Sequence, residues 1–176
     1  MSRTEQRPQP AHLCMARREF LILGGASVVS LGTVGEAGAQ LVGSSYPRKV
    51  VGTLSGLQEG TAVEFTYPNE ETYNLLFKLG EIAGGGIGEA RDVVAFNQQC
   101  THQGAWMDVS HFQARHAVLG PCPLHLSTFD LTKFGMIVSG HATSSLPQIT
   151  LELDDDDIVA TGVQGLIWGY SVNPRA

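Results

Sequence analysis

Two short stretches of the chain, "CTHQGA" at residues 100–105 and "CPLHLS" at residues 122–127, each place a cysteine and a histidine within three positions of each other. The chain has only three cysteines, so most of its thiols lie in these stretches. Two cysteines in an oxidising compartment could instead form a disulfide, but a disulfide calls for no neighbouring histidines. The pattern therefore predicts a metal site with four ligands: Cys100, His102, Cys122 and His125.

The segments around these pairs are typical of short strands separated by turns. The candidate strands are residues 61–67, 73–80, 93–97, 116–120, 127–131, 136–140, 148–153, 158–163 and 165–169. Strands at this spacing predict an all-β, antiparallel sandwich or barrel. We expect the two Cys-His loops to leave adjacent strands and to meet at one end, where they form a small metal-binding subdomain. The acidic run 154–157 is predicted to form a hairpin turn, and "GGGIG" at 84–88 a flexible turn.

Composition limits the classes of protein that need to be considered. A chain of 176 residues with 43% hydrophobic and 16% charged residues is typical of one ordinary globular domain. The net charge of −6 argues against a nucleic-acid partner, because phosphates require a basic surface.

The first forty residues differ from the rest. Arg17 and Arg18 precede an apolar, glycine-rich stretch at residues 21–35, and a small-residue cleavage site follows at 37–39. The paired arginines resemble a twin-arginine export signal, which moves folded proteins. We predict a signal peptide at 1–39, a mature domain at 40–176 and a periplasmic location. A retained anchor is the alternative and would allow membrane association, but the apolar stretch is short for a spanning helix.

The order of the ligands distinguishes two kinds of metal site. Zinc sites usually take like ligands in pairs, as C-x₂₋₄-C and H-x₃₋₅-H. Each loop here mixes the two types instead. A two-iron cluster explains the mixing, because each loop can give its cysteine to one iron and its histidine to the other. The order favours the two-iron cluster, and a zinc-stabilised binding module remains the alternative.

The two loops resemble those of the Rieske [2Fe–2S] family. Gly104 after the first pair and Pro123 after the second cysteine match that family, and residues 140–147 resemble its proline-containing loop that covers the cluster. The resemblance implies the Rieske fold, in which two loops form a cluster-binding subdomain. It also implies one [2Fe–2S] cluster held by two cysteines and two histidines.

The chain departs from some Rieske proteins at informative positions. Ala105 and Leu124 stand where relatives in quinol–cytochrome c complexes have two bridging cysteines. Ser127 matches a serine that hydrogen-bonds to the cluster sulfurs in those relatives, whereas Phe129 stands in place of a tyrosine. Losing that hydroxyl is expected to lower the reduction potential. His141 lies in the cover loop, where it either tunes the potential or only packs.

Four further segments resemble the small subunit of arsenite oxidase: "FTYP" (65–68), "LFKLG" (76–80), "ATSSLP" (142–147) and "GVQGLIWG" (162–169). This resemblance implies a periplasmic electron-transfer subunit that does not itself turn over substrate. Its partners would be a large molybdopterin-containing catalytic subunit and a cytochrome c or blue copper acceptor. Small subunits of iodate reductase are close relatives that these residues do not separate. A Rieske subunit of a quinol-oxidising complex is a further alternative, although such subunits normally keep an anchor and a loop disulfide.

Three other side chains near the loops are weaker candidates. His111 and His116 have the wrong spacing to pair with a cysteine, so we expect them on the surface or in a strand. Trp106 directly follows the first loop and is predicted to shield it by packing.

Overall fold

The computed structural model describes residues 46–175. The predicted signal peptide at 1–39 lies outside these residues. Within the described part, no helix is long and apolar enough to cross a membrane.

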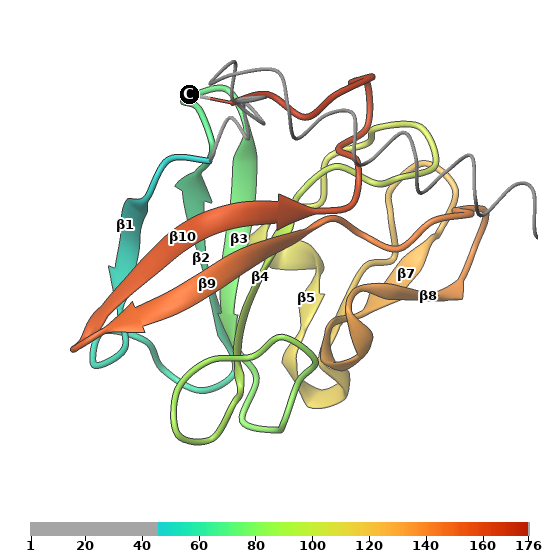
Figure 1. Cartoon of the computed structure of the whole chain (residues 1–176). Coiled ribbons are helices and arrows are strands. Elements are labelled where there is room, and N and C mark those ends of the chain that lie inside the picture. Colours follow the sequence, from blue (N-terminus) through green and yellow to red (C-terminus); the bar gives the residue numbers. More distant parts are fainter. Residues whose placement is uncertain (1–45, 176) are drawn as a thin grey trace, which may run out of the picture. The chain divides into compact units, whose positions relative to one another are not determined.

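The described chain consists of ten strands and three single-turn 3₁₀ helices (Figure 1). The strands are β1 Lys49–Thr53, β2 Thr61–Thr66, β3 Tyr73–Lys78, β4 Val93–Asn97, β5 Phe112–Gln113, β6 Val118–Leu119, β7 Thr128–Asp130, β8 Met136–Ser139, β9 Gln148–Asp154 and β10 Asp157–Gln164. The helices are η1 Val109–His111, η2 Ala114–His116 and η3 Leu131–Lys133. All strand pairs are antiparallel, in a six-stranded sheet of order β1-β10-β9-β4-β3-β2 and a four-stranded sheet of order β5-β6-β7-β8.

The central strands β3 and β4 are buried on both faces. Successive side chains of a strand point to opposite faces of its sheet. On one face, Phe77 and Phe96 join a core that also contains the buried residues of the four-stranded sheet. On the other face, Leu76 and Ala95 join a second core beneath β9 and β10. The two cores make this pair of strands the rigid support from which the first Cys-His loop extends.

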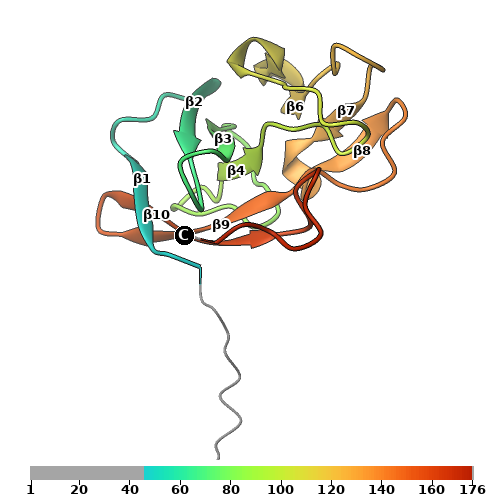
Figure 2. The same cartoon turned by 90° about the horizontal axis from the view of Figure 1, so that it is seen from above.

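The six-stranded sheet curls so that its two edge strands approach each other (Figure 2). The edges β1 and β2 are joined through side chains, since Lys49 Nζ donates to Thr66 Oγ1 at 3.0 Å. The same ammonium lies 2.8 Å from a carboxylate oxygen of Glu70. The sheet is therefore a near-barrel, and polar side chains bridge its seam.

The two Cys-His loops meet at one end, but they leave strands of different sheets. The first loop follows β4 of the six-stranded sheet, whereas the second connects β6 to β7 of the four-stranded sheet. The prediction that the loops leave adjacent strands is therefore wrong. The core shared by both sheets, which contains Leu75 of β3 and Leu119 of β6, brings the loops together instead.

Most predicted strands are present, with ends shifted by at most two residues. The acidic hairpin is confirmed, because Asp154 pairs with Asp157 across a two-residue turn between β9 and β10. The predicted strand at 165–169 is wrong: this segment is a loop. Gly165 and Gly169 both have φ of 89°, outside the range of a strand. The side chain of Asn173 takes the place of a neighbouring strand by accepting from Ile167 N–H and donating to Gly165 C=O.

Candidate metal centre

The two ligand loops have the same backbone hydrogen-bond pattern. In the first loop, Cys100 N–H donates to Ala105 C=O and Gly104 N–H donates to Cys100 C=O, both at 2.8 Å. Each cysteine is thus held at the start of a tight turn that its own peptide groups close. The residue four positions after the cysteine has positive φ, and in the first loop this is Gly104 at 70°.

In the second loop, Cys122 N–H donates to Ser127 C=O at 2.8 Å and Leu126 N–H donates to Cys122 C=O at 3.0 Å. Leu126 takes the position of Gly104, with φ of 61°. A leucine in this left-handed region is strained by its Cβ. The second loop therefore adopts the geometry of the first despite an unfavourable residue.

The turns bring the four predicted ligands together. Cys100 and Cys122 are both buried and both free thiols. The imidazole rings of His102 and His125 contact each other, with 4.6 Å between ring centroids and an angle of 81° between the rings. The chain therefore presents two thiols and two imidazoles from two matched turns.

Each of the two histidines has a buried ring nitrogen that suits metal binding. His102 Nδ1 and His125 Nδ1 are buried, and neither has a hydrogen-bond partner among the described residues. Buried polar atoms without partners are rare and costly in folded proteins. An imidazole nitrogen that coordinates a metal needs no hydrogen bond. The two Nδ1 atoms thus have the environment expected of metal ligands.

The protonation of these groups also suits a metal. Burial raises the pKa of the Cys100 thiol, and the Cys122 thiol also raises it, against lowering by the backbone N–H of His102 and the Ser127 hydroxyl. A bound cation would supply the positive charge that a buried thiolate lacks. Burial lowers the pKa of His102, and the neighbouring His125 and His141 lower it further. The imidazole is therefore neutral at pH 7, which is the form that coordinates metal.

Ser127 connects the second loop to both of its neighbours. Its Oγ accepts hydrogen bonds from His141 N–H and Ala142 N–H of the cover loop, each at 3.1 Å. Because a hydroxyl has two acceptor sites and one donor, the proton of this hydroxyl remains for the Cys100 sulfur, whose pKa it lowers. The buried Ser127 hydroxyl thus accepts two hydrogen bonds and donates one.

The cover loop, residues 140–147, closes over the first ligand loop. Thr101 Oγ1 donates to Ser144 C=O at 2.7 Å. The ring of His141 stacks on that of His102, with 5.7 Å between centroids. Gly140 has φ of 95°, and a Cβ at this position would overlap the backbone of Ser127. Glycine at this position permits the close approach of the cover loop to the second ligand loop.

The predicted ligands are of the number and kind that a [2Fe–2S] cluster takes, two thiols and two imidazoles. A [2Fe–2S] cluster needs only two protein ligands for each iron, since sulfide ions complete the coordination. The four predicted ligands fit this cluster.

The remaining predicted residues lie around the centre. Phe129 of β7 is fully buried in the same core as both cysteines. Trp106 is half-exposed, and its ring contacts that of Tyr73 edge-on at 5.8 Å. His111 Nδ1 lies 3.0 Å from an Asp108 oxygen in η1, whereas His116 is exposed in η2.

The profile of the Rieske [2Fe-2S] domain family matches residues 49–150, which include both ligand loops and the whole cover loop. The chain belongs to the Rieske family. The Rieske domain binds one [2Fe–2S] cluster, and the all-β fold predicted from the sequence is confirmed.

Three known proteins are especially similar to this Rieske chain. An iodate reductase subunit IdrB of Denitromonas iodatirespirans is 55% identical over 93% of this chain and 91% of the relative. The IdrB subunit of Pseudomonas sp. (strain SCT) is 52% identical over 89% of this chain and 83% of the relative. The crystal structure of the soluble domain of Rieske protein II (soxF) from Sulfolobus acidocaldarius has a TM-score of 0.64 at 23% identity. The match covers 74% of this chain and 84% of that structure. At this identity, the likeness shows the fold alone.

One residue beside the Rieske loops was not expected from the sequence. Trp168, in the C-terminal segment, packs its ring against Gly104 of the first loop. The short apolar run in "GLIWG" favours a strand, so the sequence did not indicate this contact. The two flanking glycines were the available signal for a loop.

Proposed function

We propose that this chain is the Rieske electron-transfer subunit of an iodate reductase-type molybdenum oxidoreductase. The observation that carries the proposal is the 55% and 52% identity to two iodate reductase subunits over most of all three chains. A large molybdopterin-containing subunit would bind and convert the substrate, as the resemblance to arsenite oxidase implies. This chain would exchange electrons with that subunit and with a soluble carrier such as a cytochrome c or a blue copper protein.

We also propose the four protein ligands of the cluster. The Sγ atoms of Cys100 and Cys122 would bind one iron, and the Nδ1 atoms of His102 and His125 the other. The cluster, when bound, accepts and releases one electron. The residues of the chain do the rest: the matched turns hold the ligands, the core excludes water from the thiolates, and the Ser127 hydroxyl stabilises negative charge on sulfur.

Arsenite oxidase is the other member of this class that the sequence resembles, and it requires electrons to flow the opposite way. Reduction of iodate consumes electrons, so a Rieske subunit would pass them to the large subunit. Oxidation of arsenite releases electrons, so the subunit would receive them. The direction of electron flow in the assembled complex therefore separates the two functions.

The experiment uses the complex of this chain with the large subunit encoded beside it. The cluster is first reduced, the reductant is removed, and iodate is added while the visible spectrum is recorded. We expect iodate to restore the oxidised spectrum in the complex but not in this chain alone, which serves as the control. Bleaching of the oxidised complex by arsenite, with no response to iodate, would assign the arsenite function instead.

We propose that the protein is periplasmic and that the twin-arginine route exports it folded. The support is in the sequence, where Arg17 and Arg18 precede the apolar stretch. Changing both to lysine should retain the precursor in the cytoplasm, together with any large subunit exported on the same signal. Normal accumulation of the double variant in the periplasmic fraction would contradict the proposal.

A further inference from the structure

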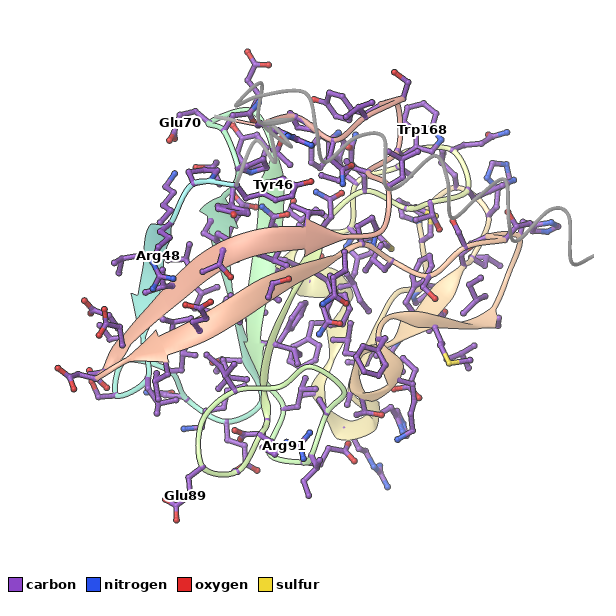
Figure 3. All side chains as sticks on the ribbon, viewed as in Figure 1. Tyr46, Arg48, Glu70, Glu89, Arg91 and Trp168 are labelled. Carbon is purple, nitrogen blue, oxygen red and sulfur yellow. The ribbon has the colours of Figure 1, made fainter. Side chains whose placement is uncertain are left out.

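The C-terminal segment, residues 165–175, is an ordered loop that runs from β10 to the first ligand loop. Ile167 anchors it, because its side chain is fully buried. Asn173 fixes its curvature by accepting from Ile167 N–H at 2.8 Å and donating to Gly165 C=O at 2.7 Å. The segment between these anchors carries Trp168, whose position is labelled in Figure 3.

Trp168 lies directly against the first ligand loop. A Cβ added at Gly104 would overlap the six-membered part of the Trp168 ring. One side of the Trp168 ring contacts Gly104, and 43% of the residue is exposed. It also lines a hollow of about 430 Å³ with Trp106, Tyr170 and three other residues. The indole therefore covers Gly104 from the solvent side.

The first loop needs such support because no disulfide holds it. Both described cysteines are free thiols, and Ala105 and Leu124 occupy the positions where some relatives have a bridge. The Thr101 hydroxyl ties the loop to Ser144 of the cover loop. The contact of Trp168 with Gly104 is a second contact with a segment outside the loop, and it opposes outward movement of the turn.

We infer that Trp168 is a positioning residue that holds the first ligand loop closed and shields it from water. The inference rests on the proposed ligation by Cys100 and His102. It does not require Trp168 to touch a ligand, since the ring acts through Gly104. The contact also gives this glycine a second role, because only a residue without a Cβ leaves space for the indole.

Shielding has a definite effect on the reduction potential. Two ferric ions, two sulfides, two thiolates and two neutral imidazoles sum to zero charge, and reduction makes the cluster negative. Water stabilises the charged form more than the neutral one. Removing Trp168 should therefore raise the potential as well as loosen the loop. A side chain that only contributed to folding would leave the potential unchanged.

The test compares three variants of the full mature chain loaded with its cluster. Trp168→Ala removes the ring, Trp168→Phe keeps an aromatic ring at the contact, and Trp106→Ala removes the other tryptophan that lines the hollow. Trp106 is the only other tryptophan of the chain and is similarly exposed, but its ring contacts Tyr73. The readouts are the rate of cluster loss to a chelator, the potential by protein-film voltammetry, and far-UV circular dichroism to verify folding.

We expect Trp168→Ala to lose its cluster at least about threefold faster than wild type. Its reduced-to-oxidised ratio at a fixed potential should rise by up to tenfold, and tenfold corresponds to about 59 mV for one electron. Trp168→Phe should recover most of both properties, and Trp106→Ala should have a smaller effect than Trp168→Ala, because the Trp106 ring contacts Tyr73 and not Gly104. A folded Trp168→Ala protein with the wild-type loss rate and potential would overturn the inference, as would equal effects in Trp106→Ala. If the proposed ligation were wrong, the result would differ, because the wild-type chain itself would then lack a Rieske spectrum.

Discussion

The imidazole ring of His141 lies nearly parallel to that of His102, with 26° between the ring planes and 5.7 Å between the centroids. The same ring lies 6.1 Å from that of His125. His141 belongs to the exposed face of the cover loop. A charge at this position therefore lies close to both histidines proposed to bind the outer iron.

The potential should follow the charge placed at His141. Because a positive charge stabilises the reduced cluster, His141→Lys should raise the potential and His141→Glu should lower it. Two unit charges about 6 Å apart interact with ~0.7 kcal/mol in water, which corresponds to roughly 30 mV for one electron. Voltammetry of both variants measures the shifts, and added salt should reduce them.

A charge change at a distant residue provides the control for the two His141 variants. Glu89 lies at the opposite end of the molecule from the Trp168 contact on the first loop (Figure 3). Glu89→Lys changes the charge by two units but should shift the potential much less. Shifts of the same sign in His141→Lys and His141→Glu would show that packing of this side chain, and not its charge, sets its effect.

Alanine in place of any one of the four proposed ligands should abolish the [2Fe–2S] spectrum. Each ligand supplies one of four protein bonds to the cluster, and the remaining three cannot hold both irons. Visible absorption and electron paramagnetic resonance of the purified variants provide the measurement. His116→Ala is the matched control, because this histidine is exposed in η2 and should leave the spectrum intact. A full cluster signal in the His102→Ala protein would refute the assignment.

Phe129→Tyr should raise the reduction potential by several tens of millivolts. Phe129 is fully buried in the core that holds both cysteines, and a hydroxyl at its para position would donate to a cysteine sulfur. Such a bond favours the extra electron of the reduced state, and a charge-assisted hydrogen bond is worth ~1.5–3 kcal/mol at most. Voltammetry gives the potential and thermal unfolding gives the stability. An unchanged potential together with a loss of ~1–3 kcal/mol would mean that the hydroxyl is buried without a partner.

Leu126→Gly should stabilise the protein. Leu126 has φ of 61°, which costs a residue with a Cβ roughly 1–2 kcal/mol. Glycine removes this strain but adds about 0.5–1 kcal/mol of unfolded-state entropy, so the net gain should be ~0.5–1 kcal/mol, measured by chemical denaturation. Leu124 is similarly exposed in the same loop but does not have positive φ. Leu124→Gly should therefore destabilise, and equal effects of the two changes would contradict this explanation.

The sequence predicted the features that depend on residue type and short spacing. The apolar run at 93–97 identified β4 and the alternating residues at 148–153 identified β9, both with nearly correct ends. The acidic turn between β9 and β10 follows from four consecutive aspartates. The four proposed ligands were found for the same reason, since the cysteine and histidine of each pair are only two or three residues apart.

Features that depend on long-range packing were not predictable from the sequence. "GLIWG" contains a short apolar run typical of a strand, yet two glycines with positive φ and the Asn173 side chain make it a loop against Gly104. The left-handed Leu126 was equally hidden, because leucine rarely adopts this conformation and only the match to the first loop explains it. The arrangement of the loops on two different sheets follows from the shared core, which joins residues distant in sequence.

The four backbone hydrogen bonds that close the ligand loops leave the ligand side chains free to bind. Each bond joins one peptide group to another, so no thiol or imidazole is used to close a turn. The conformational entropy that the ligands lose on binding a cluster is then mainly that of four side chains.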